Sequence, residues 1–263
     1  MKPLVFAGVP FNMLELIRDI LRGNPVAIDD VVCLRGGVIQ PNGFAQGDNL
    51  SPLLFSVLIA HLPSRIKTRH AAVEVILYAD DLILYSASRF HLQQALATLS
   101  PYVGEVGLQI NTSETQAMKF RRGGKVAGTD VLYLNGESVE LVNSFAYLGV
   151  TLACALSFTT HIEERQRKAL VAINSIATPR LLSLRTALAL FDLKVAPVAS
   201  FGIQIIWKRL SVAQLETPER IKPVYLKRVF GLRTSTKNRF VCLLTDTKLF
   251  VEDLRDRYKL GNT

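Results

Sequence analysis

The stretch VEVILYADDLILY, residues 73–85, decides the fold of this chain. Runs rich in Val, Ile, Leu and Tyr stand on both sides of Ala79-Asp80-Asp81, and such residues are enriched in β-strands. We therefore expect two antiparallel strands joined by a tight turn, with the acidic residues at its tip. The apolar residues of both strands would anchor the hairpin and hold the carboxylates in a fixed place.

Two neighbouring carboxylates on such a turn suit a hard divalent cation. Mg²⁺ takes oxygen ligands in an octahedron, usually one or two carboxylates together with substrate phosphates. Two such ions can hold the attacking and leaving oxygens of a phosphoryl transfer. Aspartate is also common in solvated turns, so the pair by itself leaves that alternative open.

A second informative string, QGDNLSPLLF at residues 46–55, lies upstream of the hairpin. Gly47 permits a close approach of the backbone to a ligand. Ser51 is a candidate N-cap and Pro52 a candidate first helical residue, so the apolar run 53–62 is expected to form a buried helix. The start of that helix would suit a phosphate, although an ordinary capped core helix has the same pattern.

In this order and spacing, the two strings resemble the palm domain of reverse transcriptases, in particular those of non-LTR (LINE-type) retrotransposons. The string at 73–85 looks like motif C, and the string at 46–55 looks like motif B. Two further blocks follow in family order: residues 107–120 resemble motif D, and FAYLGV at 145–150 resembles motif E, the primer grip. The resemblance extends to residues 8–18, a helix between motifs A and B, and to 195–207, part of the thumb.

The resemblance implies a role for each matched residue. Asp80 would bind the catalytic Mg²⁺ ions, with Asp81 as its neighbour, and Tyr78 would pack beside the primer terminus. Gln46 and Gly47 would lie near the incoming nucleotide and the template. The primer grip would be formed by Tyr147, Leu148 and Gly149.

Two departures from the family pattern bear on activity. The second metal-binding aspartate of the family belongs to motif A, upstream of the first helix, so we expect an N-terminally truncated chain without motif A and fingers. Asp29 and Asp30 are expected to form a polar turn rather than replace it. Motif D usually reads Asn-x-x-Lys-Thr, but after Asn111 this chain has Glu114 at the lysine position. An ammonium can donate a proton and neutralise developing charge, and an ionised glutamate does neither.

These patterns predict an α+β chain, with a partial palm over 1–155 (motifs B to E, an antiparallel sheet with helices) and an all-α thumb-like region over 156–263. Asn135-Gly136 is expected to be a hairpin turn between strands at 131–134 and 138–141. A strand is expected over 116–120. The apolar spacing predicts helices over 10–22, 88–104, 161–178, 184–195 and 212–231.

The net charge of +9 is concentrated in one half of the chain. Residues 1–120 hold nine Lys and Arg against ten Asp and Glu, whereas residues 121–263 hold 22 against 12. A basic thumb would neutralise phosphates without reading sequence, and a solvated helix face is the alternative for each residue. The candidates are Arg165, Arg167, Lys168, Lys208, Arg209, Arg220, Lys222, Lys227, Arg228 and Arg233.

The composition of the chain argues against several other classes of protein. The cysteines at 33, 154 and 242 lack paired spacing, which argues against a disulfide framework or a zinc site and fits a reducing compartment. Residues 188–207 come nearest to a membrane span, but Asp192, Lys194 and Pro197 interrupt it. Residues 1–22 lack the layout of a signal peptide, so we expect an intracellular protein, nuclear or cytoplasmic, without a membrane partner. The four histidines are too dispersed for a metal site and receive no role.

Two functions follow as hypotheses. The first is RNA-directed DNA polymerase chemistry with weakly bound Mg²⁺, an RNA template, a DNA primer and deoxynucleotide triphosphates. Activity of this chain alone is not expected, because motif A is absent and Glu114 replaces lysine. The second is a non-catalytic retroelement remnant that at most binds nucleic acid through the basic thumb. A primer-extension assay separates them.

Overall fold

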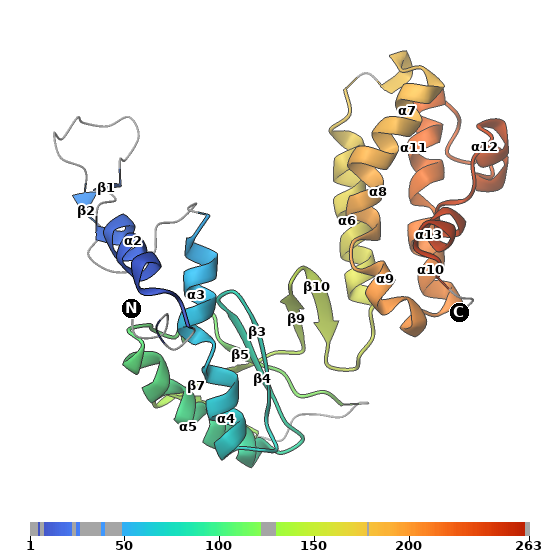
Figure 1. Ribbon diagram of the computed structural model, residues 1–263. Helices are drawn as coiled ribbons and strands as arrows, with labels where there is room; N and C mark the ends of the chain where they lie inside the picture. The colour runs from blue at the N-terminus through green and yellow to red at the C-terminus, as the bar shows by residue number, and fades with distance from the viewer. Residues whose placement is uncertain are drawn as a thin grey trace. The chain divides into compact units, whose positions relative to one another are not determined.

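The computed structural model describes residues 5, 8–22, 25–26, 38–39, 49–121, 130–177 and 179–260, with only the backbone at 20–22, 25–26 and 38–39. The chain forms two compact units (Figure 1). The first comprises residues 1–117 and 127–140, and the second comprises residues 118–126 and 141–263. The described sheets each have two strands, and helices make up most of the rest, which is the mixture of an α+β chain.

The first unit opens with helix α2 (Phe11–Arg22), as the apolar spacing predicts. Leu14 and Ile17 lie on one face of this helix and pack with Leu54 of helix α3 (Ser51–Ile59) in a small buried cluster. A short antiparallel pair, β1 (Pro25–Val26) and β2 (Val38–Ile39), lies between the two helices in the sequence.

Helix α3 differs from its prediction in three respects. Leu50, not Ser51, is its N-cap, and it ends at Ile59 before a separate helix α4 (Leu62–Arg69). The break has a simple cause: Pro63 has no N–H to donate to the Ile59 carbonyl, and its ring disfavours a continuous helix. Only two of its residues are buried, so the expectation of a buried helix over 53–62 is wrong.

The hairpin predicted over 73–85 is confirmed. Strands β3 (Glu74–Tyr78) and β4 (Asp81–Tyr85) pair antiparallel, with Leu77 opposite Leu82 and Tyr78 opposite Asp81. Alternate side chains share a face of a sheet. One face, carrying Val75, Leu77, Leu82 and Leu84, packs on the main core of the unit.

Helices α4 and α5 (Arg89–Glu105) cover that apolar face, and Figure 1 shows both helices beside the hairpin. The core they share with the strands contains Ile66, Ala95, Leu96 and Leu99, all buried. The predicted apolar face of the 88–104 helix is therefore the face that it buries.

Short strands complete the first unit. Asn135 and Gly136 form the predicted turn between β6 (Tyr133–Leu134) and β7 (Glu137–Ser138), with φ of 53° and 84°. Positive φ at both central residues is what a type I′ turn requires. The strand expected over 116–120 is limited to β5 (Gln116–Ala117), which pairs with β8 (Glu140–Leu141).

The second unit begins with an antiparallel hairpin of β9 (Ser144–Tyr147) and β10 (Val150–Ala153). The rest of the unit is helical. Its elements are α6 (Thr159–Asn174), η1 (Pro179–Leu181), α7 (Leu184–Leu190), η2 (Phe191–Val195), α8 (Ala196–Ser200), α9 (Ile203–Ile206), η3 (Trp207–Arg209), α10 (Val212–Glu219), α11 (Ile221–Phe230), α12 (Asn238–Leu244) and α13 (Phe250–Tyr258).

The three helices predicted here are present, with altered boundaries. The one expected over 212–231 is divided at Arg220 into α10 and α11. The one expected to end at Val195 continues to Ser200 through a wide π turn at η2. Pro197 lies two residues after this turn, and its missing N–H would leave a regular α-helical turn one hydrogen bond short.

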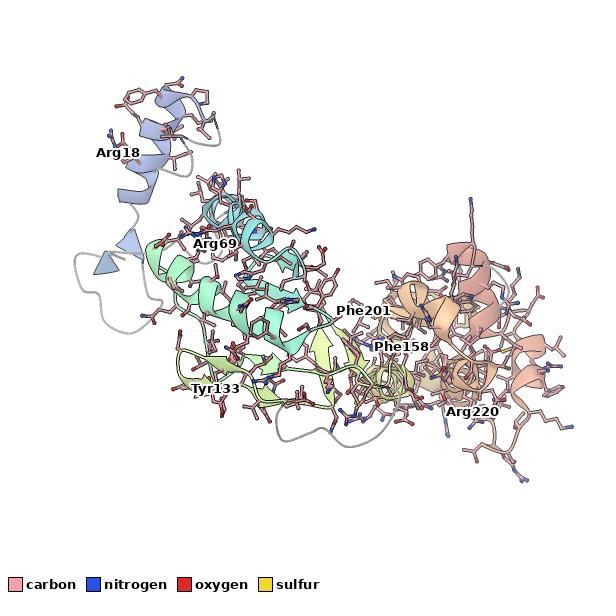
Figure 2. All side chains as sticks on the ribbon, turned by 90° about the horizontal axis from the view of Figure 1, so that it is seen from below. Arg18, Arg69, Tyr133, Phe158, Phe201 and Arg220 are labelled. Atoms are coloured by element: carbon pink, nitrogen blue, oxygen red, sulfur yellow. The ribbon has the colours of Figure 1, made fainter. Side chains whose placement is uncertain are left out.

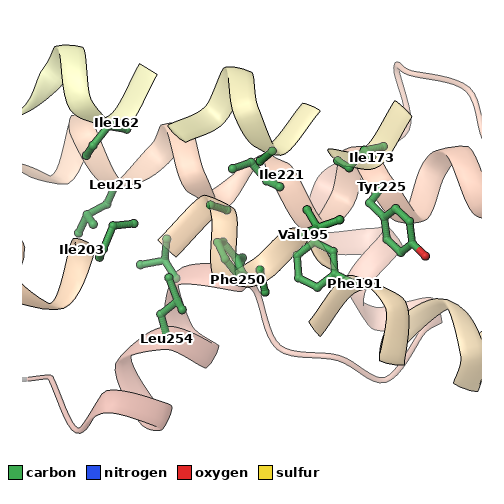
Figure 3. Close-up of a cluster of buried hydrophobic side chains, with 14 of the residues drawn as sticks. Ile162, Ile173, Phe191, Val195, Ile203, Leu215, Ile221, Tyr225, Phe250 and Leu254 are labelled. Carbon is green, nitrogen blue, oxygen red and sulfur yellow. The ribbon is translucent and has the colours of Figure 1, made fainter. Parts of the chain in front are cut away.

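Side chains from helices α6 to α13 form the core of the second unit, and Figure 3 shows part of this cluster. Phe191 meets Phe250 edge-on with ring centroids 5.4 Å apart, and its centroid lies 5.6 Å from that of Tyr225. The Tyr225 hydroxyl donates a 2.9 Å hydrogen bond to the carbonyl of Ala187. Trp207 is 2% exposed in the same cluster, so its indole is part of this core.

None of the described helices is by itself long and apolar enough to cross a membrane. By length and composition, only the bent pair Leu184–Ser200 and Ile203–Arg209 passes as a combined segment. Phe191, Val195 and Ile203 of this pair are buried in the core of the second unit.

Candidate active site

The acidic pair lies at the tip of the β3–β4 hairpin. The register makes Ala79 and Asp80 the two central residues of the turn, and Asp81 is the first residue of β4. Ala79 has a φ of 50°, and a positive φ at this first central position is typical of type II′ turns. Both aspartates are exposed, so the turn presents two carboxylates to solvent.

The face of the hairpin that points away from the core carries Asp81 and large apolar or aromatic side chains. Because side chains alternate, Asp81 shares this face with its partner Tyr78 and with Ile76. Tyr78 is 61% exposed and Ile76 is 43% exposed. An acid, a phenol ring and an aliphatic side chain therefore form one accessible surface next to the turn.

The acidic pair offers the donor chemistry that Mg²⁺ prefers, since carboxylate oxygens are hard ligands. Within the described ranges, no group of three or more His, Cys, Asp or Glu side chains could hold a metal ion. Asp80 and Asp81 thus fit part of a magnesium site, to which substrate phosphates or further carboxylates would have to contribute.

Several predicted residues fall outside the described residues. These are Gln46 and Gly47 of the string that resembles motif B, together with Asp29 and Asp30. The description resumes at Asn49, and helix α3, which begins within the string at Ser51, is present.

The segment that resembles motif D forms a compact turn closed by Asn111. The Asn111 side-chain oxygen accepts hydrogen bonds from the Ser113 N–H at 3.2 Å and from the Ser113 hydroxyl at 2.7 Å. The Asn111 carbonyl accepts from the Thr115 N–H at 3.1 Å. Glu114 lies within this turn and is exposed. Asn111 therefore shapes the loop that presents Glu114.

The segment that resembles the primer grip is the β9–β10 hairpin of the second unit. Leu148 and Gly149 form its two-residue turn, with φ of 47° and 79°. Tyr147 is half-buried at the end of β9, and Leu148 is exposed. A Cβ on Gly149 would lie only 2.9 Å from Cε1 of Phe201, so the turn sits directly on that ring.

Beside this hairpin lies a residue to which the sequence pattern assigns no role. His161 of α6 is fully buried, and its Nδ1 accepts the Thr151 N–H of β10 at 3.2 Å. Its Nε2 lies 3.0 Å from the Phe201 carbonyl, which can only accept, so Nε2 carries the hydrogen. Both ring nitrogens are satisfied in the neutral form.

Burial lowers the pKa of His161, and the positive charges of Arg165 and Lys168 lower it further, against the opposing effects of the Phe201 bond and of Glu164. The imidazole is thus held neutral. Its partners are ten and forty residues away in the sequence, and no local motif could have indicated them.

The basic residues divide into those already engaged and those on the surface. Lys222 is only 6% exposed, and its Nζ donates to the Lys248 carbonyl at 2.9 Å. Its place among the phosphate-binding candidates is therefore wrong, because its ammonium points to the main chain. Arg165 donates to the Gly149 carbonyl and stacks 4.5 Å from the centre of the Phe201 ring.

The other basic residues proposed to bind phosphate fall into two groups, those with a side-chain partner within the protein and those described only as exposed. Arg220 pairs with Glu216, Lys227 bonds Asn238, and Arg228 bonds Asn174. The remaining side chains are exposed: Arg167, Lys168, Lys208, Arg209 and Arg233.

A hairpin with a Tyr-Ala-Asp-Asp tip, the turn at Asn111 and the β9–β10 hairpin follow one another along the chain in the order that the resemblance to reverse transcriptases predicts. Residues 8–152 match the family described as "Reverse transcriptase (RNA-dependent DNA polymerase)". Because this match covers more than half of the chain, the chain belongs to the reverse transcriptase family.

Curated relatives identify the kind of reverse transcriptase. The chain is 30% identical over 217 residues to the probable RNA-directed DNA polymerase from transposon BS of Drosophila melanogaster, covering 77% of this chain and 23% of the relative. It is 26% identical over 208 residues to the RNA-directed DNA polymerase from mobile element jockey of the same species, covering 70% and 22%. A third, the retrovirus-related Pol polyprotein from type-2 retrotransposable element R2DM, is 28% identical over 113 residues, covering 41% and 11%.

These relatives are proteins of non-LTR retrotransposons, as the sequence resemblance predicts. The chain spans less than a quarter of the length of each of the three. It is therefore similar to one part of those proteins, the reverse transcriptase domain.

Proposed function

We propose that this chain supplies the motif C carboxylates and the primer grip of a retrotransposon RNA-directed DNA polymerase. The observation that carries the proposal is the register of the β3–β4 hairpin, which leaves Asp80 and Asp81 exposed at its tip while a half-buried apolar face anchors the strands on the core. The substrates would be an RNA template, a DNA primer and deoxynucleotide triphosphates.

Asp80 and Asp81 would hold Mg²⁺ through their carboxylate oxygens. When bound, this ion would neutralise the charge of the triphosphate and of the leaving pyrophosphate. Tyr78, exposed on the same face as Asp81, would pack against the primer terminus. Positioning and charge neutralisation dominate phosphoryl transfer of this kind, so a rigid hairpin is a suitable support.

The other sites are assigned by the family resemblance. Gln46 and Gly47 would lie near the incoming nucleotide and the template. Tyr147, Leu148 and Gly149 would contact the primer from the β9–β10 hairpin, whose turn is tightly packed on Phe201.

We further propose that residues 1–263 alone do not extend a primer. Two adjacent carboxylates make an incomplete site for two ions, and a motif A aspartate would have to complete it. Glu114 adds a second defect, since an exposed carboxylate repels a polyphosphate that a lysine would attract. Losing one electrostatic donor costs on the order of 10²–10³ in rate.

The second candidate function is non-catalytic binding of nucleic acid. It is favoured by the exposed cations of the second unit, including Arg167, Lys208 and Arg209. Phosphate neutralisation would give an affinity that falls steeply as salt is raised.

Primer extension on an RNA template with Mg²⁺ tests the proposal. We expect no extension by the chain alone, and a gain when a segment bearing motif A is fused upstream and Glu114→Lys is introduced. The gain must disappear with Asp80→Ala, which serves as the matched control. Extension that survives Asp80→Ala would refute the assigned site. No gain from the repair, with salt-sensitive duplex binding retained, would favour the second function.

A further inference from the structure

The β9–β10 hairpin is joined to the helices of the second unit by a set of polar contacts that no pattern in the sequence indicates. Five residues form the set: Thr151 of β10, His161, Glu164 and Arg165 of α6, and Phe201 after α8. We call this set the His161 clamp. Figure 2 labels Phe201, which lies where the hairpin strands meet the helices of this unit.

The clamp holds the middle of β10 through a buried histidine. The imidazole of His161 accepts from the Thr151 N–H and donates to the Phe201 carbonyl, so one ring joins the hairpin, helix α6 and the corner between α8 and α9. The Thr151 hydroxyl adds a 2.7 Å bond to the Glu164 carboxylate. A buried donor or acceptor that loses its partner is costly, so these bonds favour one position of the strand.

The turn of the hairpin is held by Arg165. Its guanidinium donates to the Gly149 carbonyl and lies over the Phe201 ring, with Cζ 4.5 Å from the ring centre. On the other side of the clamp, a Cβ on Gly202 would meet Val150 Cγ2 at 3.0 Å and His161 Nε2 at 3.2 Å. Glycines at 149 and 202 thus allow the hairpin to approach the helices closely.

Apolar packing continues the same interface. Val150 and Leu152 of β10 pack against the helical core of the second unit. The hairpin is therefore joined to this unit by apolar contact, by buried hydrogen bonds and by an arginine that caps its turn.

We infer that His161 and Arg165 are positioning residues, which fix the hairpin of Tyr147, Leu148 and Gly149 on the helices so that hairpin and helices move as one body. The part of this inference that concerns a primer rests on the proposed function, in which the hairpin contacts the primer. Its consequence is that the primer contact and the exposed cations of the second unit, such as Arg167 of α6, would have a fixed spacing along a bound duplex.

Hydrogen exchange measured by mass spectrometry on the full chain tests the clamp without any activity. In His161→Phe, which leaves the Thr151 N–H and the Phe201 carbonyl unpaired, peptides covering β9 and β10 should exchange about tenfold to a hundredfold faster, as expected for a lost buried bond. Peptides of α11 and α12 should keep their protection. His161→Gln, which can accept and donate one bond each, should recover part of the protection.

Arg165→Gln provides a second variant that leaves the buried histidine in place. It should accelerate exchange at the turn of the hairpin, whereas Arg167→Gln, which removes the same charge two residues along α6, should not. If β9 and β10 exchange no faster in His161→Phe and Arg165→Gln than in Arg167→Gln, the clamp is refuted. A uniform loss of protection across the whole second unit in Arg165→Gln would also refute the clamp.

Duplex binding separates this inference from the proposed function. Fluorescence anisotropy with a labelled RNA–DNA primer–template should give weaker binding for Arg165→Lys, which keeps the charge but cannot reproduce the contact of a guanidinium with the Phe201 ring. Faster hairpin exchange with unchanged duplex affinity would support the clamp and count against the primer role of the hairpin. Unchanged exchange with weakened affinity would support the nucleic-acid role and overturn the clamp.

Discussion

Replacing Gly149 by alanine tests the packing of the hairpin turn most directly. Gly149 has a φ of 79°, and a Cβ there would lie 2.9 Å from Cε1 and 3.2 Å from Cζ of Phe201. The left-handed backbone alone costs an alanine about 1 kcal/mol. Phe201 is 45% exposed and its ring can shift, so overpacking adds about 1 kcal/mol, the low end of the range for a core. We therefore expect the free energy of unfolding of the second unit to fall by about 2 kcal/mol.

Gly231 provides the matched control in the same unit. It has a φ of 64° after the end of α11, but the nearest atoms to its Cβ position belong to the flexible guanidinium of Arg180, at 3.6–3.9 Å. These are ordinary contacts. Gly231→Ala should therefore lose only the backbone contribution, about 1 kcal/mol.

The single tryptophan of the chain makes the assay selective. Trp207 is buried in the core of the second unit, so urea unfolding followed by its fluorescence reports on that unit. Linear extrapolation gives the free energy of unfolding, and an unchanged slope confirms that the same surface is exposed. Equal losses for Gly149→Ala and Gly231→Ala would show that the turn does not pack on Phe201 in solution.

Two further predictions concern the same unit and the same assay. Burial lowers the pKa of His161 from 6.5, so the unfolded chain binds the proton first and the free energy of unfolding should fall as pH drops below 6.5. His161→Gln should remove this pH dependence. A pH dependence that persists in the variant would refute its assignment to His161. Burial raises the pKa of Glu219, so this carboxyl group should raise the free energy of unfolding as pH falls through that raised value. Glu219→Gln is therefore measured alongside to separate the two effects. Ser211→Ala should cost about 1 kcal/mol, since the Ser211 hydroxyl accepts the Gln214 N–H and the Gln214 side chain accepts the Ser211 N–H; no loss would mean that water replaces this cap.

Local sequence predicted the elements whose geometry depends on a few neighbouring residues. The hairpin at 73–85 follows from strand-forming runs on both sides of a two-residue turn, and Asn135-Gly136 follows from its tolerance of positive φ. The helix positions also followed from apolar spacing, because one face of each had to be buried.

Long-range packing decided what the same patterns could not. The apolar run 53–62 looked like a buried helix, but α3 ends at Ile59, ahead of Pro63, and most of α3 finds no cover among the described residues. Lys222 looked like a surface cation, but its helix turns it into the unit, where a main-chain carbonyl satisfies it. Burial depends on what lies opposite a residue, and the pattern along one segment does not contain that information.

The sequence by itself determined the family and placed the acidic pair at the tip of a hairpin, because motif spacing and turn chemistry are local properties. Only the tertiary structure revealed that the β9–β10 hairpin is held by His161, Arg165 and Phe201 within the second unit. The hydrogen bonds that hold it join residues up to forty positions apart. Such a bond depends on the three-dimensional position of both partners rather than on their spacing in the chain.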